Sequence, residues 1–185
     1  MTRVLVPVAT GFEEIEAVSI IDVLRRAEIE VLVASLDENA LVKGANGITI
    51  QTDLEIKNIS IDDIEMIVLP GGWDGTYALA DDENVQRILT EMDAKGKQIA
   101  AICAAPFALN KAGVLKENYT CYPSVEEQIR EEGYRGDSSM VVEDANVMTS
   151  RGPATAMCFA LEIVKKLKGE ETFNALKAGL LATYC

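Results

Sequence analysis

Cys103 is the residue of this sequence whose type and position most favour chemistry. It follows the apolar run "QIAAI" and precedes "AAPFAL", a pattern typical of a strand that turns into a helix. A cysteine at such a turn is presented at the top of a sheet, and a helix N-terminus can lower its pKa from about 8.5 to roughly 3.5–7.5. We therefore predict a reactive thiolate, with Ala104 and Ala105 leaving space for a substrate. A buried structural cysteine is an equally strong interpretation.

Glu16 is the candidate acid or base, because the chain contains no histidine. Thr10 and Glu13 match a capping box, which predicts a helix that starts at Thr10. Glu13 and Glu14 would then lie in the first turn and interact with the helix dipole. Glu16 lies deeper, has no helical ion-pair partner and is surrounded by apolar residues in sequence. Such a carboxyl group stays protonated and can donate a proton or a hydrogen bond. The alternative is a solvated glutamate on a helix surface.

Two glycines and one arginine complete the candidate set. Gly71 and Gly72, in "PGGWDG", allow close approach to the backbone where a strand ends, and the N–H groups of Gly72 and Ala104 could bind an oxyanion. An ordinary turn is the alternative. The sequence has neither the G-x-G-x-x-G pattern nor the phosphate-binding G-x-x-x-x-G-K-[ST] pattern of nucleotide sites. Arg151, in "TSRGPAT", is expected to form an ion pair or to contact an anion.

The elements that must position these residues alternate between strands and helices. Non-alternating Val/Ile/Leu runs favour a mostly parallel sheet with helices on both faces, in one domain over residues 1–185. Because ligands bind at the carboxyl ends of parallel strands, we expect "ATGFEE", "LPGGWDG" and "AICAAP" to form one pocket. Expected strands are 3–9, 30–35, 64–70, 98–102, a short strand 119–123 and two runs within 140–150; a hairpin is expected over 40–52, and helices over 13–28, 81–96, 105–115, 124–133, 152–169 and 170–185.

Composition excludes several classes of function. Seventeen basic and thirty acidic residues give a net charge of −13, which repels nucleic acid and anionic membranes. No apolar run has the length of a membrane span, and the N-terminus reads as a first strand rather than a signal peptide. We therefore expect a cytoplasmic protein.

The four cysteines are spaced irregularly, and no zinc-binding set exists without histidine. We expect reduced thiols. Cys158 lies within the apolar pattern of its predicted helix, so it should be buried and inert. Cys185 should be freely modified.

Several motifs together resemble the ThiJ/PfpI superfamily, in particular a bacterial-type member of its parkinsonism-associated deglycase (DJ-one) branch. The matching stretches are "GFEEIEAV", "DVLRRAEIEVLVAS", "IVLPGGWDG", "AAICAAPFAL" and "VMTSRGPATA", in that order along the whole chain. The resemblance implies a flavodoxin-like three-layer sandwich and a homodimer to which the hairpin and the first helix contribute. It also implies Cys103 as an oxidisable nucleophile, Glu16 as its protonated partner, and Gly72 and Ala104 as pocket amides.

The sequence departs from related branches at three positions. Ala104 stands where protease-like branches carry the histidine of a triad, Tyr122 stands where some members carry a histidine, and Asn46 stands where some bring an arginine from the hairpin. These changes predict weak catalysis, in which Tyr122 is a weaker pocket acid.

The resemblance implies cofactor-free and metal-free glyoxalase or deglycase chemistry in carbonyl-stress defence, on a small 2-oxoaldehyde or a glycated protein. In that chemistry the cysteine adds to the aldehyde and the glutamate moves protons. The alternative is a redox-sensing chaperone whose Cys103 oxidises to a sulfinate without any turnover.

Overall fold

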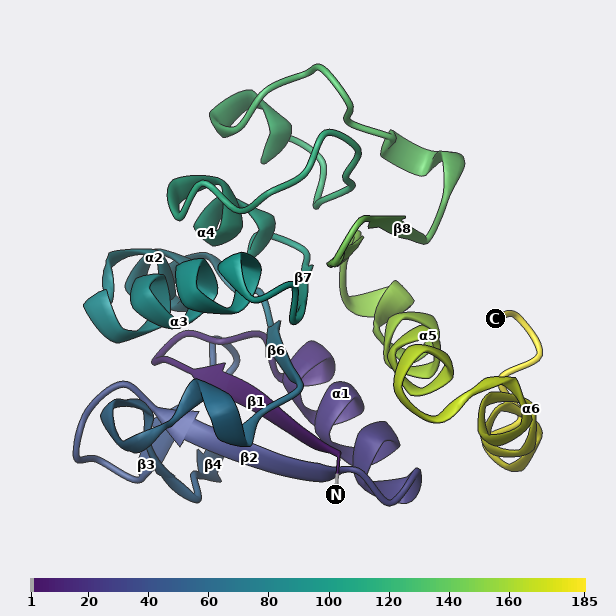
Figure 1. Cartoon of the computed structure of the whole chain (residues 1–185), viewed down its shortest axis with the longest axis horizontal. Helices are drawn as coiled ribbons and strands as arrows, with labels where there is room; N and C mark the ends of the chain where they lie inside the picture. The colour runs from purple at the N-terminus through teal and green to yellow at the C-terminus, as the bar shows by residue number, and fades with distance from the viewer. Residues whose placement is uncertain (1) are drawn as a thin grey trace.

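A seven-stranded sheet forms the centre of the molecule in the computed structural model, which describes residues 2–185. Every pairing in this sheet is parallel except that of β8 with β9. Figure 1 shows helices on either side of it. In sheet order the strands are β5 (Leu54–Glu55), β2 (Glu30–Ser35), β1 (Arg3–Val8), β6 (Met66–Leu69), β7 (Gln98–Ile102), β9 (Val147–Ser150) and β8 (Val141–Asp144).

Helices cover both faces of the sheet because successive strand residues point to opposite sides. In β1, Val4 and Val6 join the core under one set of helices, whereas Leu5 joins the core under the other. The predicted flavodoxin-like sandwich is therefore confirmed. One layer contains α1 (Glu14–Arg26), α5 (Ala156–Lys168) and α6 (Glu170–Gly179), and the other contains α2 (Trp73–Asp81), α3 (Glu83–Ala94) and α4 (Pro106–Lys111).

The predicted hairpin is present as β3 (Leu41–Lys43) and β4 (Thr49–Gln51), which pair antiparallel. Two backbone hydrogen bonds attach it to the segment that enters α1. The N–H of Gly11 donates to the carbonyl of Lys43 at 2.8 Å, and the N–H of Ala45 donates to the carbonyl of Phe12 at 2.9 Å. The hairpin is thereby held beside the N-terminus of α1.

The start of α1 differs from the predicted capping box. The helix begins at Glu14, and its N-cap is Glu13, whose carboxylate accepts a hydrogen bond from the N–H of Glu16 at 2.8 Å. Thr10 lies in the turn before the helix, where Gly11 has a φ of 86°. The prediction failed because the Glu13 carboxylate itself accepts from a backbone N–H three residues later, which makes Glu13 the N-cap rather than the third residue of the helix.

Other predicted helices are shorter or replaced by irregular structure. The helix expected over 81–96 corresponds to α3, which spans only Glu83–Ala94, because Asp81 is the last residue of α2. The side chain of Asp82 caps α3 by accepting from the N–H of Val85 at 2.9 Å. The expected acidic helix over 124–133 is a turn that contains the 3-10 segment Glu126–Gln128. The expected strand over 119–123 is an irregular segment with one isolated bridge, between Tyr119 and Tyr134. The segments 119–123 and 124–133 lie outside the sheet and helix layers, so tertiary contacts determine their conformation.

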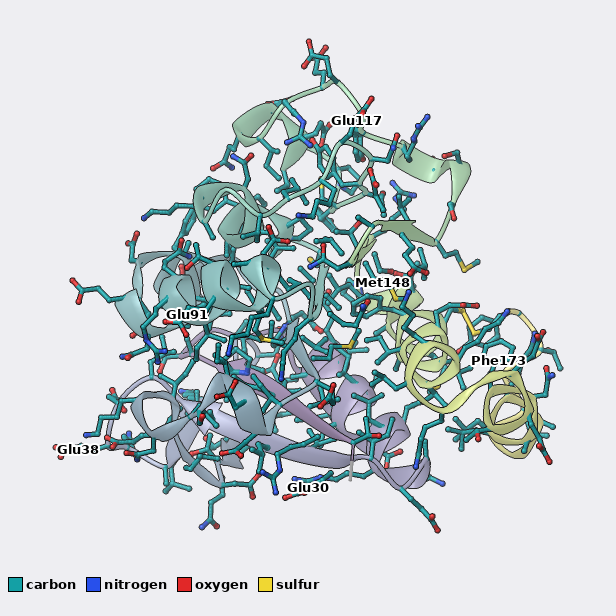
Figure 2. The ribbon with its side chains drawn as sticks, in the orientation of Figure 1. Glu30, Glu38, Glu91, Glu117, Met148 and Phe173 are labelled. Carbon is teal, nitrogen blue, oxygen red and sulfur yellow. A yellow bond between two sulfur atoms is a disulfide. The ribbon has the colours of Figure 1, made fainter. Side chains whose placement is uncertain are left out.

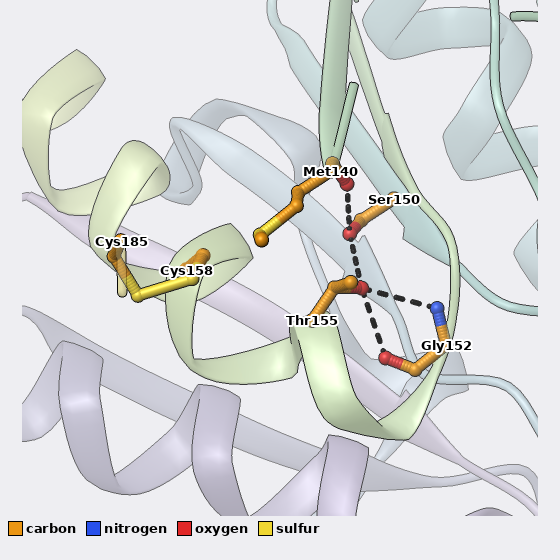
Figure 3. The surroundings of a disulfide bond; sticks show 6 residues. All are labelled: Met140, Ser150, Gly152, Thr155, Cys158 and Cys185. Atoms are coloured by element: carbon orange, nitrogen blue, oxygen red, sulfur yellow. Dashed lines mark hydrogen bonds between the residues drawn. A yellow bond between two sulfur atoms is a disulfide. The ribbon is translucent and has the colours of Figure 1, made fainter. Parts of the chain in front are cut away.

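A disulfide joins Cys158 on α5 to Cys185 in the tail that follows α6 (Figure 3). The predictions of reduced thiols and of a freely modified Cys185 are therefore wrong for this pair. Sequence spacing could not reveal the pairing, because it depends on how the tail folds back onto α5. Cys103 and Cys121 remain free and buried.

Across residues 2–185, no helix has both the length and the apolar composition that a membrane crossing requires. Side chains such as Glu38 and Glu117 project outward from the surface (Figure 2), in keeping with the negative net charge.

Candidate active site

Cys103 occupies the turn between β7 and α4, as the sequence pattern predicts. Its φ of 64° lies in the left-handed region, which is uncommon for a residue with a side chain and marks a strained turn. Two backbone bonds hold it there: its N–H donates to the carbonyl of Ser150 at 3.0 Å, and its carbonyl accepts from the N–H of Tyr122 at 2.9 Å. Cys103 is 8% exposed, so its thiol is almost completely buried.

Glu16 lies in the first turn of α1 and is completely buried. Its Oε2 atom accepts a hydrogen bond from the N–H of Gly71 at 2.8 Å. Its Oε1 atom is also buried and, among the described residues, has no hydrogen-bond partner of standard geometry. A solvated glutamate on a helix surface is therefore not what the fold contains.

Burial raises the pKa of Glu16 to about 7. The Gly71 amide and the Cys103 thiol lower that pKa by smaller amounts through hydrogen bonding, and the charge of Glu13 raises it further. Near neutral pH the carboxyl group therefore exists in both protonation states. A group with this property can accept and return a proton within one reaction cycle.

Gly71 lies between the two reactive side chains, and there is no space for a side chain of its own. A Cβ atom placed on Gly71 would lie 2.7 Å from both the Cβ of Cys103 and the Oε2 of Glu16. Gly72 has a φ of 92°, and a Cβ placed there would lie 2.3 Å from the carbonyl oxygen of Gly11. The "PGG" segment thus allows the loop after β6 to pass directly between α1 and the cysteine turn.

The backbone amides of Ala104 and Gly72 favour the Cys103 thiolate and lower its pKa. Burial acts in the opposite direction and is the larger effect, and the charge of Glu16 adds to it, so the pKa of the Cys103 thiol is raised well above its ordinary value. The prediction of a lowered pKa is therefore wrong in direction. It relied on the helix field and on a hydrogen bond from a protonated Glu16, whereas α4 is only six residues long and the thiol is buried beside a carboxyl group that raises its pKa.

Glu14 is a site-forming residue that sequence reasoning missed. It is 4% exposed and accepts hydrogen bonds from the Asn46 backbone N–H at 2.6 Å, from the Asn46 Nδ2 at 3.0 Å and from the Ile48 N–H at 3.3 Å. Burial opposes its ionisation, but these bonds outweigh burial and hold the pKa of Glu14 below its ordinary value. Asn46 therefore anchors the hairpin to α1. The available signal was the run "EEIE", which places acids on two faces of the helix.

Tyr122 approaches the site through its backbone, while its side chain is 43% exposed and packs against Gly152. Of the two expectations for Arg151, an ion pair or an anion contact, the structure shows an ion pair with Asp137. Three aromatic rings not singled out from the sequence lie in series beside the site: Tyr77 contacts Trp73, which follows Gly72, and Phe107, which lies on α4.

The matching motifs, the fold and the geometry of the cysteine turn all point to one family. The profile of the DJ-1/PfpI family matches residues 2–166. The chain belongs to the DJ-1/PfpI family. It is similar to protein dj-1beta of Drosophila melanogaster, with 40% identity over 181 residues that cover 97% of each chain. The crystal structure of that protein superposes with a TM-score of 0.93, again at 40% identity and 97% coverage of each chain.

Two further relatives carry enzyme names. The glutathione-independent glyoxalase DJR-1.2 of Caenorhabditis elegans is 38% identical over 165 residues, covering 89% of this chain and 87% of its own. The glutathione-independent glyoxalase DJ-1 of Schizosaccharomyces pombe is 32% identical over 188 residues, covering 97% of this chain and 98% of its own.

Proposed function

We propose that this protein is a glutathione-independent glyoxalase that converts small 2-oxoaldehydes such as methylglyoxal to 2-hydroxy acids, with Cys103 as nucleophile and Glu16 as proton carrier. The observation that carries this proposal is the pairing of a strained, buried thiol with a buried carboxyl group whose pKa lies at about 7. The relatives named as glyoxalases support the reaction class.

The first step is addition of Cys103 to the aldehyde carbon. Because the pKa of the thiol is raised, its proton must leave as the C–S bond forms, and ionised Glu16 is the base beside it. The sulfur electron pair forms the C–S bond, the π pair of the C=O bond moves to the aldehyde oxygen, and protonation of that oxygen yields a hemithioacetal. The backbone N–H groups of Gly72 and Ala104, which favour negative charge at the sulfur, would also stabilise the oxyanion that develops on the carbon bonded to it.

Isomerisation and hydrolysis follow. Glu16 removes the proton from the former aldehyde carbon, giving an enediol, and returns a proton to the neighbouring carbon, giving a thioester of the 2-hydroxy acid. Water then cleaves the thioester, releasing the acid and restoring the Cys103 thiol. The sum is one 2-oxoaldehyde plus one water to one 2-hydroxy acid. With a glycated protein as substrate, the same steps would release the amine, which is the deglycase variant of this proposal.

Consumption of methylglyoxal by the purified protein, without added glutathione, tests the proposal. We expect slow turnover to lactate and none with Cys103→Ser, whereas Cys121→Ser, which changes the other free thiol, keeps the activity. Retention of turnover by Cys103→Ser would contradict the assignment of the nucleophile.

The alternative function is a redox-responsive chaperone. It is favoured by the donors that face the sulfur: two amides, and a Glu16 carboxyl group whose raised pKa keeps a proton available near neutrality. These would hydrogen-bond a Cys103 sulfinate and slow its further oxidation. A folded protein that consumes no methylglyoxal, yet suppresses aggregation of a client protein only after peroxide treatment, would favour this alternative.

We also propose that the protein acts as a homodimer. Apolar side chains near the N-terminus of α1 and on the hairpin are exposed, with Ile15 at 58%, Val18 at 47% and Ile48 at 56%. Beside them, Val18 and Ile21 of α1 line a hollow together with Ile50 of β4. A continuous apolar face built from these two elements is the kind of surface that a second copy would bury.

A further inference from the structure

Four sulfur-containing side chains line one cavity, and Cys103 is not among its lining residues. The cavity has a volume of about 370 Å³ and lies between the β8–β9 edge of the sheet, α5 and the C-terminal tail. Met140 and Met148 line it from the sheet edge, and Cys158 and Cys185 line it from α5 and the tail. Figure 3 shows the Met140 side chain directed toward Cys158, and Figure 2 places Met148 at the α5 side of the sheet.

The two cysteines are positioned to act together when reduced. Their Cα atoms are 5.1 Å apart. Cys158 lies in the first turn of α5 and is 4% exposed, whereas Cys185 belongs to a short tail that Ala182, itself buried, holds in place. Reduction would therefore leave two thiols facing the same cavity, on Cα atoms close enough for both to bind one ion.

The donor set selects a particular class of metal. Within residues 2–185 no group of three His, Cys, Asp or Glu side chains is arranged to hold a metal ion. Two carboxylates also line the cavity: Glu143, which is engaged in an ion pair with Lys166, and Glu162. Sulfur atoms outnumber the carboxylates around this cavity, and two thiolates supplemented by two thioethers are the soft donors that favour Cu(I).

We propose that reduction of the Cys158–Cys185 disulfide creates a binding site for Cu(I), with the two thiolates as principal ligands and Met140 and Met148 as thioether ligands. A dithiol reductant supplies the two electrons and two protons that cleave the S–S bond, and is itself oxidised to a disulfide. Cu(I) then displaces the two thiol protons, and its own oxidation state does not change. The site is separate from Cys103 and does not depend on the proposed glyoxalase activity.

The test is titration of Cu(I) into the full-length protein under anaerobic conditions, against a chromophoric Cu(I) chelator. The reduced protein should take one Cu(I) per chain from the chelator, and the disulfide form should take none at this site. Cys185→Ser should abolish this binding in the reduced protein, and because the change lies in the tail it leaves the core intact. Met140→Leu should weaken binding by roughly tenfold or more.

Cys103→Ser and Cys121→Ser are the matched controls, and each should bind Cu(I) as the parent does. X-ray absorption of the copper-loaded parent should show sulfur neighbours alone. The proposal is overturned if the reduced parent takes no Cu(I) from the chelator, if Cys185→Ser retains it, if binding is lost with Cys103→Ser, or if nitrogen or oxygen ligands surround the ion.

Discussion

Substitution of Glu16 by glutamine should make the protein more stable at neutral and alkaline pH, and the gain should disappear in acid. The folded-state pKa of Glu16 is about 7, against 4.5 for an unperturbed glutamate. Between these values the folded state binds the proton more tightly than the unfolded state does, so the free energy of unfolding falls as pH rises. The difference of about 2.5 pKa units corresponds to roughly 3 kcal/mol, lost between about pH 4 and pH 8.

Glutamine keeps the shape of the side chain and cannot ionise. Its amide oxygen can accept from the N–H of Gly71, as Oε2 of Glu16 does at 2.8 Å, and its NH₂ group can face Cys103. Below pH 8 the Cys103 thiol is neutral in the folded state because its pKa is raised, and an unfolded thiol is also largely neutral there. The difference in the free energy of unfolding between parent and variant therefore changes with pH only through the ionisation of Glu16.

Urea unfolding of parent and Glu16→Gln at pH 5, 6, 7 and 8 measures this difference while avoiding the isoelectric region near pH 4.4. We expect the variant's advantage to grow by about 2–3 kcal/mol over that range, with most of the growth below pH 7. Glu132→Gln, which changes an exposed glutamate in the segment after η3 (Glu126–Gln128), is the control and should show a small, constant difference. A difference for Glu16→Gln that does not change with pH would refute the buried, proton-sharing carboxyl group.

Three further predictions concern activity, assembly and the disulfide. For methylglyoxal turnover, kcat/KM should rise with pH and reach half its plateau at about pH 7, as Glu16 ionises, and Glu16→Gln should lose roughly 10²–10⁴-fold with no such rise. Val18→Asp places two like charges on an isologous interface, so light scattering should give the chain mass of 20.0 kDa for the variant and twice that for the parent; a monomeric parent would contradict the dimer. Cys185→Ser opens a link spanning 27 residues and should cost about 3 kcal/mol of stability in non-reducing urea unfolding, whereas under a strong reductant parent and variant should unfold alike. In the parent, iodoacetamide should leave Cys158 and Cys185 unmodified until a reductant is added.

The sheet could be predicted from the sequence because local pattern and tertiary environment agree there. Val, Ile and Leu runs such as "EVLVAS" and "QIAAI" coincide with β2 and β7 residue for residue. These strands are buried on both faces, and a continuous apolar run is then the only sequence that suits them. The convergence of Gly71, Glu16 and Cys103 follows from the same topology, because each lies just beyond β6, β1 or β7 at one edge of the sheet.

What could not be predicted depends on contacts between distant segments. The start of α1 is decided by Glu13 and by the hairpin that binds Glu14, and the disulfide is decided by the path of the tail after α6. The sign of the Cys103 pKa shift also escaped sequence reasoning. Helix position can be read from a pattern, but the extent of desolvation requires knowing that β6, α1 and α4 all close around the thiol.

Several features that each cost stability coincide at Cys103, and this coincidence is the strongest argument against a purely structural cysteine. The residue adopts a φ of 64°, the neighbouring Glu16 is fully buried with one oxygen unpaired among the residues described, and Gly71 excludes any side chain between them. If Cys103 and Glu16 served packing alone, the protein would be more stable with alanine at position 103 and with glutamine or leucine at position 16. Strain and buried charge persist where the surrounding structure enforces them for function. Glu16→Gln separates the two interpretations, since a packing role predicts a variant unchanged in chemistry, whereas a catalytic role predicts one that is more stable and inactive.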